Sequence, residues 1–186
     1  YKNSYIIIKD IIKYIRFFTS SIFSGVNNMN REIQDIGRQI LILSSLRGVS
    51  CKKMSDAVGL APSFVSNVMK KKYLPFLDNL INIADFFGIP VEELIFKDFS
   101  KEHPTFHTPK RKWLPVDTQL RRLIFLKYKD MPENQRPTRD DVLEDIGISK
   151  GYLESKKRNM RTQLMPILVI CEYFDIPLED FLYKRF

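Results

Sequence analysis

The sequence predicts an all-α protein built from two similar helical units, and three observations support this fold class. Apolar side chains recur at three- and four-residue spacing, as at Ile36, Ile40 and Leu43, which is the spacing of one buried helix face. Neither unit alternates apolar and polar residues as a half-buried strand does. Residues 87–95 are echoed by residues 174–182, and each copy is followed by an aromatic residue and a lysine.

The composition limits the class of protein. The 186 residues suffice for one large or two small domains, and 44% hydrophobic with 28% charged residues exclude a wholly disordered chain. Two cysteines, Cys51 and Cys171, cannot form a disulfide framework, which excludes a disulfide-stapled secreted protein and predicts a reducing, cytoplasmic location. The net charge of +8 favours a polyanionic partner, either nucleic acid or an acidic membrane surface. Each unit alone is close to neutral, so a local face must meet that partner.

Residues 1–29 form an amphipathic N-terminal extension. Lys9, Asp10, Lys13 and Arg16 interrupt its apolar run, so it cannot be a transmembrane span. A basic amphipathic helix here would either lie on a membrane surface or pack on the protein or on a second subunit, and packing is the favoured reading.

The first unit, residues 30–97, begins with an apolar stripe that predicts a helix ending before Gly48. Ser50 is expected to cap a second helix, and Gly59 to form the tight turn that follows it. Pro62 suits the first position of a third helix, because the N–H that proline lacks is not needed there. Ser55 is small where the second and third helices would cross, which permits close packing.

Two more helices complete this unit. The fourth follows the basic run 70–72 and carries the apolar residues Leu77 to Phe87, after which Gly88 ends it. Pro90 begins a short fifth helix with glutamates in its first turn, where carboxylates suit the helix dipole.

The second unit, residues 117–186, repeats this order after a proline-containing linker at 98–116. Trp113, in the linker, is expected to seal the linker onto the second unit. About six extra residues separate its first and second helices. Leu143 stands where Ser55 stands in the first unit, and its third helix is expected from about Ser149 to Arg158.

The first unit resembles the Cro/C1-type (XRE-like) helix-turn-helix family in three features. They are Gly48-Val49-Ser50 before the second helix, the turn glycine Gly59 after it, and the final Gly-Ile-Pro-x-Glu-Glu-Leu pattern. The resemblance covers about residues 31–97 and, more weakly, 117–183. It implies two tandem five-helix, lambda-repressor-like domains in which a third helix enters the major groove of DNA.

The resemblance places the base-reading positions of the first unit at 62, 63 and 67. The amide of Asn67 can pair with adenine N6 and N7, and Phe64 can touch a thymine methyl group. Lysines at the end of the third helix would bind phosphates, as would the start of the second helix. The DNA-contacting residues expected in this unit are Ser50, Lys52, Pro62, Ser63, Phe64, Ser66, Asn67, Lys70, Lys71 and Lys72.

The corresponding outward residues of the second unit are Lys150, Tyr152, Ser155, Lys156 and Arg158. They would either grip DNA or form the solvated face of a dimerisation or effector domain.

Catalytic chemistry has little support. His103 and His107 are four residues apart without an accompanying cluster of Cys, Asp or Glu, so no metal site, cofactor or enzymatic activity is expected. Cys51 beside two lysines would sense oxidants or, as favoured here, be inert.

The sequence therefore predicts a sequence-specific DNA-binding transcriptional regulator, a repressor that binds double-stranded DNA. A homodimer is expected because one short helix specifies only a half-site. The alternative is a tandem protein-interaction module whose second unit binds a protein. Some anti-CRISPR proteins look like this, with one domain controlling a promoter and the other binding a nuclease, and antitoxins of similar fold are a variant.

Overall fold

The computed structural model describes residues 32–70, 74–106, 113–149, 152 and 162–186. Within these ranges the chain forms α-helices and one short 3-10 helix, and no β-strand, which confirms the all-α prediction. None of the helices in the described ranges is both long and apolar enough for a membrane crossing. The N-terminal extension, residues 1–29, lies outside the described residues.

The helices of the first unit begin and end close to where the sequence predicts. Ser50 caps its helix as expected, since its hydroxyl accepts the Lys53 N–H at 3.2 Å. Gly88 ends the fourth helix in the left-handed conformation, at φ +65°. These helices are α2 (Ile36–Leu46), α3 (Cys51–Ala57), α4 (Phe64–Met69), α5 (Leu77–Phe87) and α6 (Val91–Phe96). α4 thus begins two residues after the expected Pro62, with Ser63 as its N-cap.

The close approach of α2 and α4 depends on Gly37, which the sequence analysis did not single out. A Cβ added at Gly37 would lie 2.5 Å from Met69 Cγ and 2.8 Å from the Met69 backbone nitrogen. Only a residue without a side chain fits there, so Gly37 fixes how near α4 lies to α2.

The second unit repeats this order with one addition. Its elements are α7 (Val116–Lys127), η1 (Glu133–Gln135), α8 (Arg139–Asp145), α10 (Leu164–Phe174) and α11 (Leu178–Tyr183). The 3-10 helix η1 lies in the expected insertion between the first two helices. Asp175 takes the place of Gly88 and adopts the same left-handed backbone, at φ +52°.

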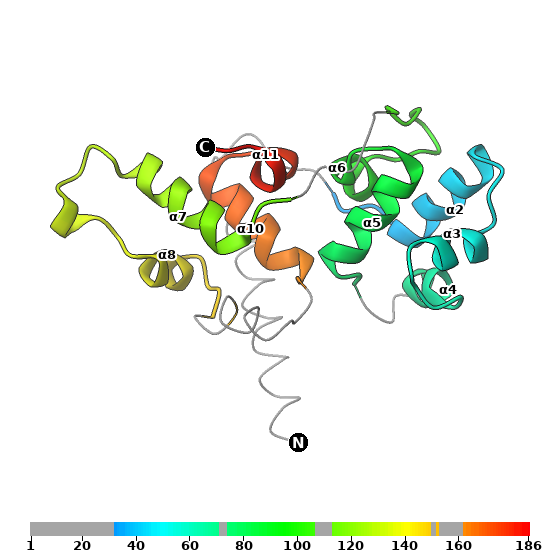
Figure 1. The fold of residues 1–186 in the computed structure, drawn as a ribbon, viewed down its shortest axis with the longest axis horizontal. Helices are drawn as coiled ribbons and strands as arrows, with labels where there is room; N and C mark the ends of the chain where they lie inside the picture. Colours follow the sequence, from blue (N-terminus) through cyan, green and yellow to red (C-terminus); the bar gives the residue numbers. More distant parts are fainter. Residues whose placement is uncertain (1–31, 71–73, 107–112, 150–151, 153–161) are drawn as a thin grey trace, which may run out of the picture.

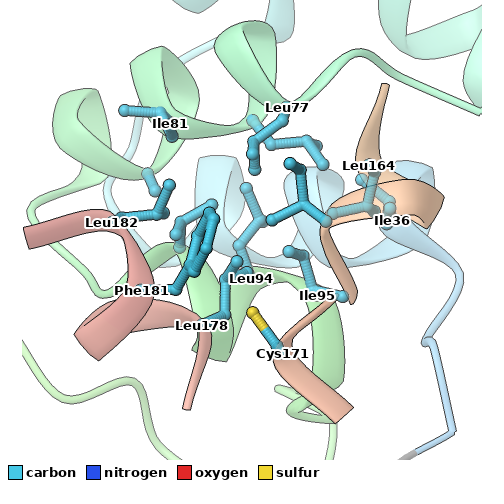
Figure 2. Packing of buried hydrophobic residues seen from close by; sticks show 14 of the residues in the cluster. Ile36, Leu77, Ile81, Leu94, Ile95, Leu164, Cys171, Leu178, Phe181 and Leu182 are labelled. Carbon is cyan, nitrogen blue, oxygen red and sulfur yellow. The ribbon is translucent and has the colours of Figure 1, made fainter. Parts of the chain in front are cut away.

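The two units pack against each other through their C-terminal helices. Figure 1 shows α5 and α6 beside α10 and α11, with α2–α4 and α7–α8 at opposite ends of the molecule. Figure 2 shows Leu94 of the first unit beside Phe181 of the second, and Ile95 of the first unit on the side of Cys171 of the second. All four side chains are fully buried, so the units share one hydrophobic core.

Each end of the segment between the units forms a hydrogen bond to one of the units. The Phe99 N–H donates to the side-chain oxygen of buried Gln39 at 2.8 Å, and the Leu114 N–H donates to the Leu182 carbonyl at 2.8 Å. Trp113, expected to seal the linker onto the second unit, is partly buried against the core that both units share. It also lines an open cavity of 680 Å³ whose other lining residues belong to α5 and the end of α3. This proximity to the first unit depends on how the two units are arranged, which sequence order alone does not reveal.

Candidate nucleic-acid interface

The candidate interface is the outer face of α3, the turn after it, and α4. Gly59 lies in the turn at φ +71°, and the Leu60 N–H returns to the Ser55 carbonyl at 2.8 Å. Ser55, the small residue expected where the second and third helices cross, is fully buried. Within the described part of the chain, its hydroxyl has no hydrogen-bond partner, so the small volume of the side chain rather than its polarity suits this position.

α4 has one buried side and one exposed side. Phe64, Val65 and Val68 are buried, at spacings that place them on the same face of the helix. This placement corrects the expectation that Phe64 presents its ring outward to a thymine methyl group. With 4% of its surface exposed, Phe64 belongs to the core.

The opposite side of α4 is polar and accessible. Ser63, Ser66 and Lys70 are exposed and Asn67 is half-buried. The Asn67 amide nitrogen lies 3.5 Å from the Ser63 hydroxyl, so these two side chains are neighbours one turn apart. Pro62, just before the helix, is also exposed. The three positions expected to read bases, 62, 63 and 67, and the further expected contact Ser66 are therefore all accessible on this part of the chain.

α3 carries two exposed lysines and, near its end, the exposed Asp56. Lys52 and Lys53 are exposed, and the first turn of α3 contains no acidic residue. Lys53 was not among the expected contacts, although its position next to Lys52 on the same short helix would have indicated it. Ser50 is exposed but its hydroxyl already serves as the cap. Cys51 is half-buried, with its sulfur 3.6 Å from the Ser44 hydroxyl.

Several expected contacts fall outside the described residues. They are Lys71, Lys72, Lys150, Ser155, Lys156 and Arg158. Tyr152 is described, and it differs from the expectation of an outward side chain. It is half-buried, and its hydroxyl donates to the Gln163 carbonyl at 3.2 Å.

The second unit carries a different charge where α3 has its lysines. Asp140 and Asp141 occupy the first turn of α8, and Asp141 forms a capping box with Thr138. Arg139 is held by carboxylates on both sides, at 2.6 Å from Asp140 and 3.0 Å from Asp117. These acidic groups repel phosphate, so this end of α8 is a poor match for the DNA backbone.

The link between α7 and α8 is electrostatic. Partial burial disfavours the charged form of Asp117, but hydrogen bonds from Arg121 and Arg139 outweigh it and hold the pKa of its carboxyl below the ordinary value. The ion pair therefore persists at neutral pH and connects the first two helices of the second unit.

Other chemistry has few candidate groups. In the portion of the chain that the structure describes, no three His, Cys, Asp or Glu side chains gather closely enough to hold a metal ion. His103 is exposed, and His107 lies outside the described residues. Burial raises the pKa of the Cys171 thiol, which keeps it protonated and unreactive.

Comparison with known proteins provides no further assignment. No protein-family model, curated protein or solved structure matches this chain.

Proposed function

We propose that this protein is a sequence-specific DNA-binding transcriptional regulator of the repressor type, in which α4 enters the major groove. The observation that carries the proposal is the division of α4 into two sides. Phe64, Val65 and Val68 anchor one side in the core, and Ser63, Ser66 and Asn67 lie together on the other. A short, rigidly held helix with a polar outer side is suited to reading base edges.

The surrounding charges support the same assignment. Lys52 and Lys53 on α3 and Lys70 at the C-terminal end of α4 are exposed, on the two helices that the turn at Gly59 joins. Contacts from such lysines to phosphates would set the register of α4 on the duplex, while base contacts would set specificity. The likeness of the first unit to the helix-turn-helix pattern points in the same direction.

The test begins by selecting duplexes from a random pool with the full chain at about 100 mM salt. Binding of the selected duplex is then measured by fluorescence anisotropy for Asn67→Ala and for the control Asn134→Ala, an exposed asparagine on η1. Asn67→Ala should weaken binding about 5- to 100-fold and relax the base preference at one position. Asn134→Ala should bind as the native chain does.

A second pair of variants examines the phosphate contacts. Lys70→Ala should weaken binding to all duplexes alike and reduce the slope of log affinity against log salt by about 0.9, the contribution of one phosphate. Lys129→Ala, at an exposed lysine of the second unit, is the matched control. If no duplex is selected, the DNA-binding proposal is wrong. If a duplex is selected but Asn67→Ala and Lys70→Ala bind it as tightly as their controls, the assignment of α4 as the reading helix is wrong.

One observation favours a second candidate function, in which the second unit binds a protein. Phe125, Leu126 and Met131 are 58%, 43% and 38% exposed and lie at the C-terminal end of α7 and just beyond it. Apolar side chains gathered on a surface are typical of protein contacts. Under this alternative, a stoichiometric partner would be lost in Phe125→Ser but retained in Asn67→Ala.

A further inference from the structure

We propose that the second unit occupies, within the same chain, the face of the first unit through which a second copy would otherwise pack. The chain would then act as a monomer, and its DNA site would not be palindromic. This inference rests on the proposed function, and it replaces the homodimer expected from the sequence with an arrangement inside one chain.

The contact between the units joins corresponding residues. Phe76 is the N-cap of α5, and Gln163 is the N-cap of α10, its counterpart in the second unit. These two residues form an isolated antiparallel bridge, in which the Leu77 N–H donates to the Thr162 carbonyl at 2.7 Å. When a residue meets its own counterpart, the two units are related by an approximate two-fold axis, as two subunits are in a symmetric dimer.

A second set of contacts has the same symmetry. Glu92 and Glu179 hold corresponding positions in the repeated segment, each in the first turn of its helix. The Val91 N–H donates to Glu179 Oε1 at 2.8 Å, and the Glu179 N–H donates to Glu92 Oε2 at 3.4 Å. Each glutamate therefore accepts a backbone N–H at the start of the helix in the other unit.

The apolar part of this face is already filled. Leu77 and Leu94 of the first unit and Leu178 and Phe181 of the second are fully buried in the shared core. A second copy of the chain would have to displace α10 and α11 to reach the same residues. Packing the two units of one chain together does not require two molecules to associate, so it avoids the loss of translational and rotational entropy. The contact between the units is therefore favoured over the same contact between two chains.

The outer faces of the two units differ, so the pseudo-dimer has no reason to select a symmetric site. The first turn of α3 has lysines and no acidic residue, whereas the first turn of α8 has Asp140 and Asp141. A symmetric homodimer selects two equal half-sites, and one chain with unlike ends selects an asymmetric sequence.

The experiment introduces cysteines at the bridge, as Phe76→Cys with Gln163→Cys, in a Cys51→Ser background that leaves only buried Cys171. Residues paired across an antiparallel bridge lie about 4.5–5.5 Å apart at Cα, a separation that a disulfide spans. Phe76→Cys alone in the same background is the matched control, because it cannot form a cross-link within one chain.

Oxidation of the double variant should give a single band at the mass of one chain, 22.0 kDa, and the oxidised protein should bind the selected duplex within about twofold of the native affinity. Sedimentation should show one native chain per selected duplex, and the selected sequence should lack two-fold symmetry. These results together support the proposal.

Other outcomes overturn it in distinguishable ways. Cross-links between chains, loss of binding on oxidation, or two native chains on a palindromic duplex would refute the monomeric arrangement while leaving DNA binding intact. The absence of any selected duplex would instead overturn the proposed function, and this inference with it. If the double variant fails to fold, the stoichiometry of the native chain on its selected duplex decides alone.

Discussion

The replacement of Gly37 by alanine is the most direct test of the packing that holds α4 in place. The added Cβ would lie 2.5 Å from Met69 Cγ, 2.8 Å from the Met69 backbone nitrogen and 3.0 Å from its Cα. The side-chain contact can be relieved by rotation, but the two backbone contacts cannot. α4 must therefore move away from α2, or α2 must bend.

The expected loss of stability follows from two opposing effects. Forcing an extra carbon into a filled site costs about 1–3 kcal/mol. Alanine is a better helix former than glycine by about 0.8–1 kcal/mol, which offsets part of that cost. The free energy of unfolding should fall by about 0–2 kcal/mol, and the melting temperature by up to about 8 °C for a chain of this size.

Urea denaturation followed by far-ultraviolet circular dichroism measures the change, with Ser45→Ala on the exposed side of α2 as control. Ser45→Ala should leave stability unchanged or raise it by a few tenths of a kcal/mol, about the propensity gain of alanine. The double variant Gly37→Ala/Met69→Ala should recover only part of the loss, because the backbone contacts remain. If Gly37→Ala is more stable than the native chain by about 0.8–1 kcal/mol, the full propensity gain of alanine with no packing cost, the close approach of α2 and α4 is wrong.

Three further changes have defined outcomes. Ser55→Ala removes a buried hydroxyl that has no hydrogen-bond partner among the described residues. Urea denaturation should therefore show unchanged stability or a gain of up to about 1 kcal/mol. A loss of more than about 1 kcal/mol would contradict the burial of an unpaired hydroxyl at Ser55. Asp175→Gly removes the strain of a side chain on the left-handed backbone at φ +52°, so it should raise the free energy of unfolding by about 0.5–1 kcal/mol and raise the melting temperature with it. Asp175→Ala should lower both quantities. The pKa of Asp117 is lowered in the folded protein, so its ion pairs stabilise the fold above the unfolded pKa of about 3.9, and this contribution is lost as the pH falls below that value. Asp117→Asn should therefore lose less stability between about pH 5 and pH 3 than the native chain does, and equal losses in the two proteins would contradict the assignment.

The helix ends could be predicted because their signals are local. Ser50 caps α3 through a residue three positions away, and Gly48, Gly59 and Gly88 each adopt a positive φ that their own lack of a side chain permits.

The assignment of Phe64 failed for a different reason. The apolar spacing of Phe64, Val65 and Val68 is that of one helix face, and on that pattern alone Phe64 is a core residue. The sequence analysis placed Phe64 outward because it stands near the expected start of the third helix, and it did not apply the apolar spacing to this residue. Successive residues of a helix turn by about 100°, so Phe64 and Val68, four positions apart, share a face.

Long-range contacts were beyond prediction. Gly37 matters only because Met69 lies above it, and Trp113 lies close to the first unit only because of how the two units meet. The repeat in the sequence indicated two similar units, but it contains no local signal for the bridge between Phe76 and Gln163.

The shared core has a consequence for the newly synthesised chain. α6 carries the buried Leu94 and Ile95 and contacts α11, which lies near the end of the chain, so the first unit leaves the ribosome with an apolar face uncovered. At about 5–20 residues per second, the covering helices follow only some 5–20 s later. During that interval the second unit of a neighbouring nascent chain can pack on the uncovered face of the first unit. The competing product is a domain-swapped dimer, in which two chains exchange their second units. Many ribosomes on one messenger RNA would thus favour domain-swapped dimers, and few ribosomes would favour the chain that folds on itself.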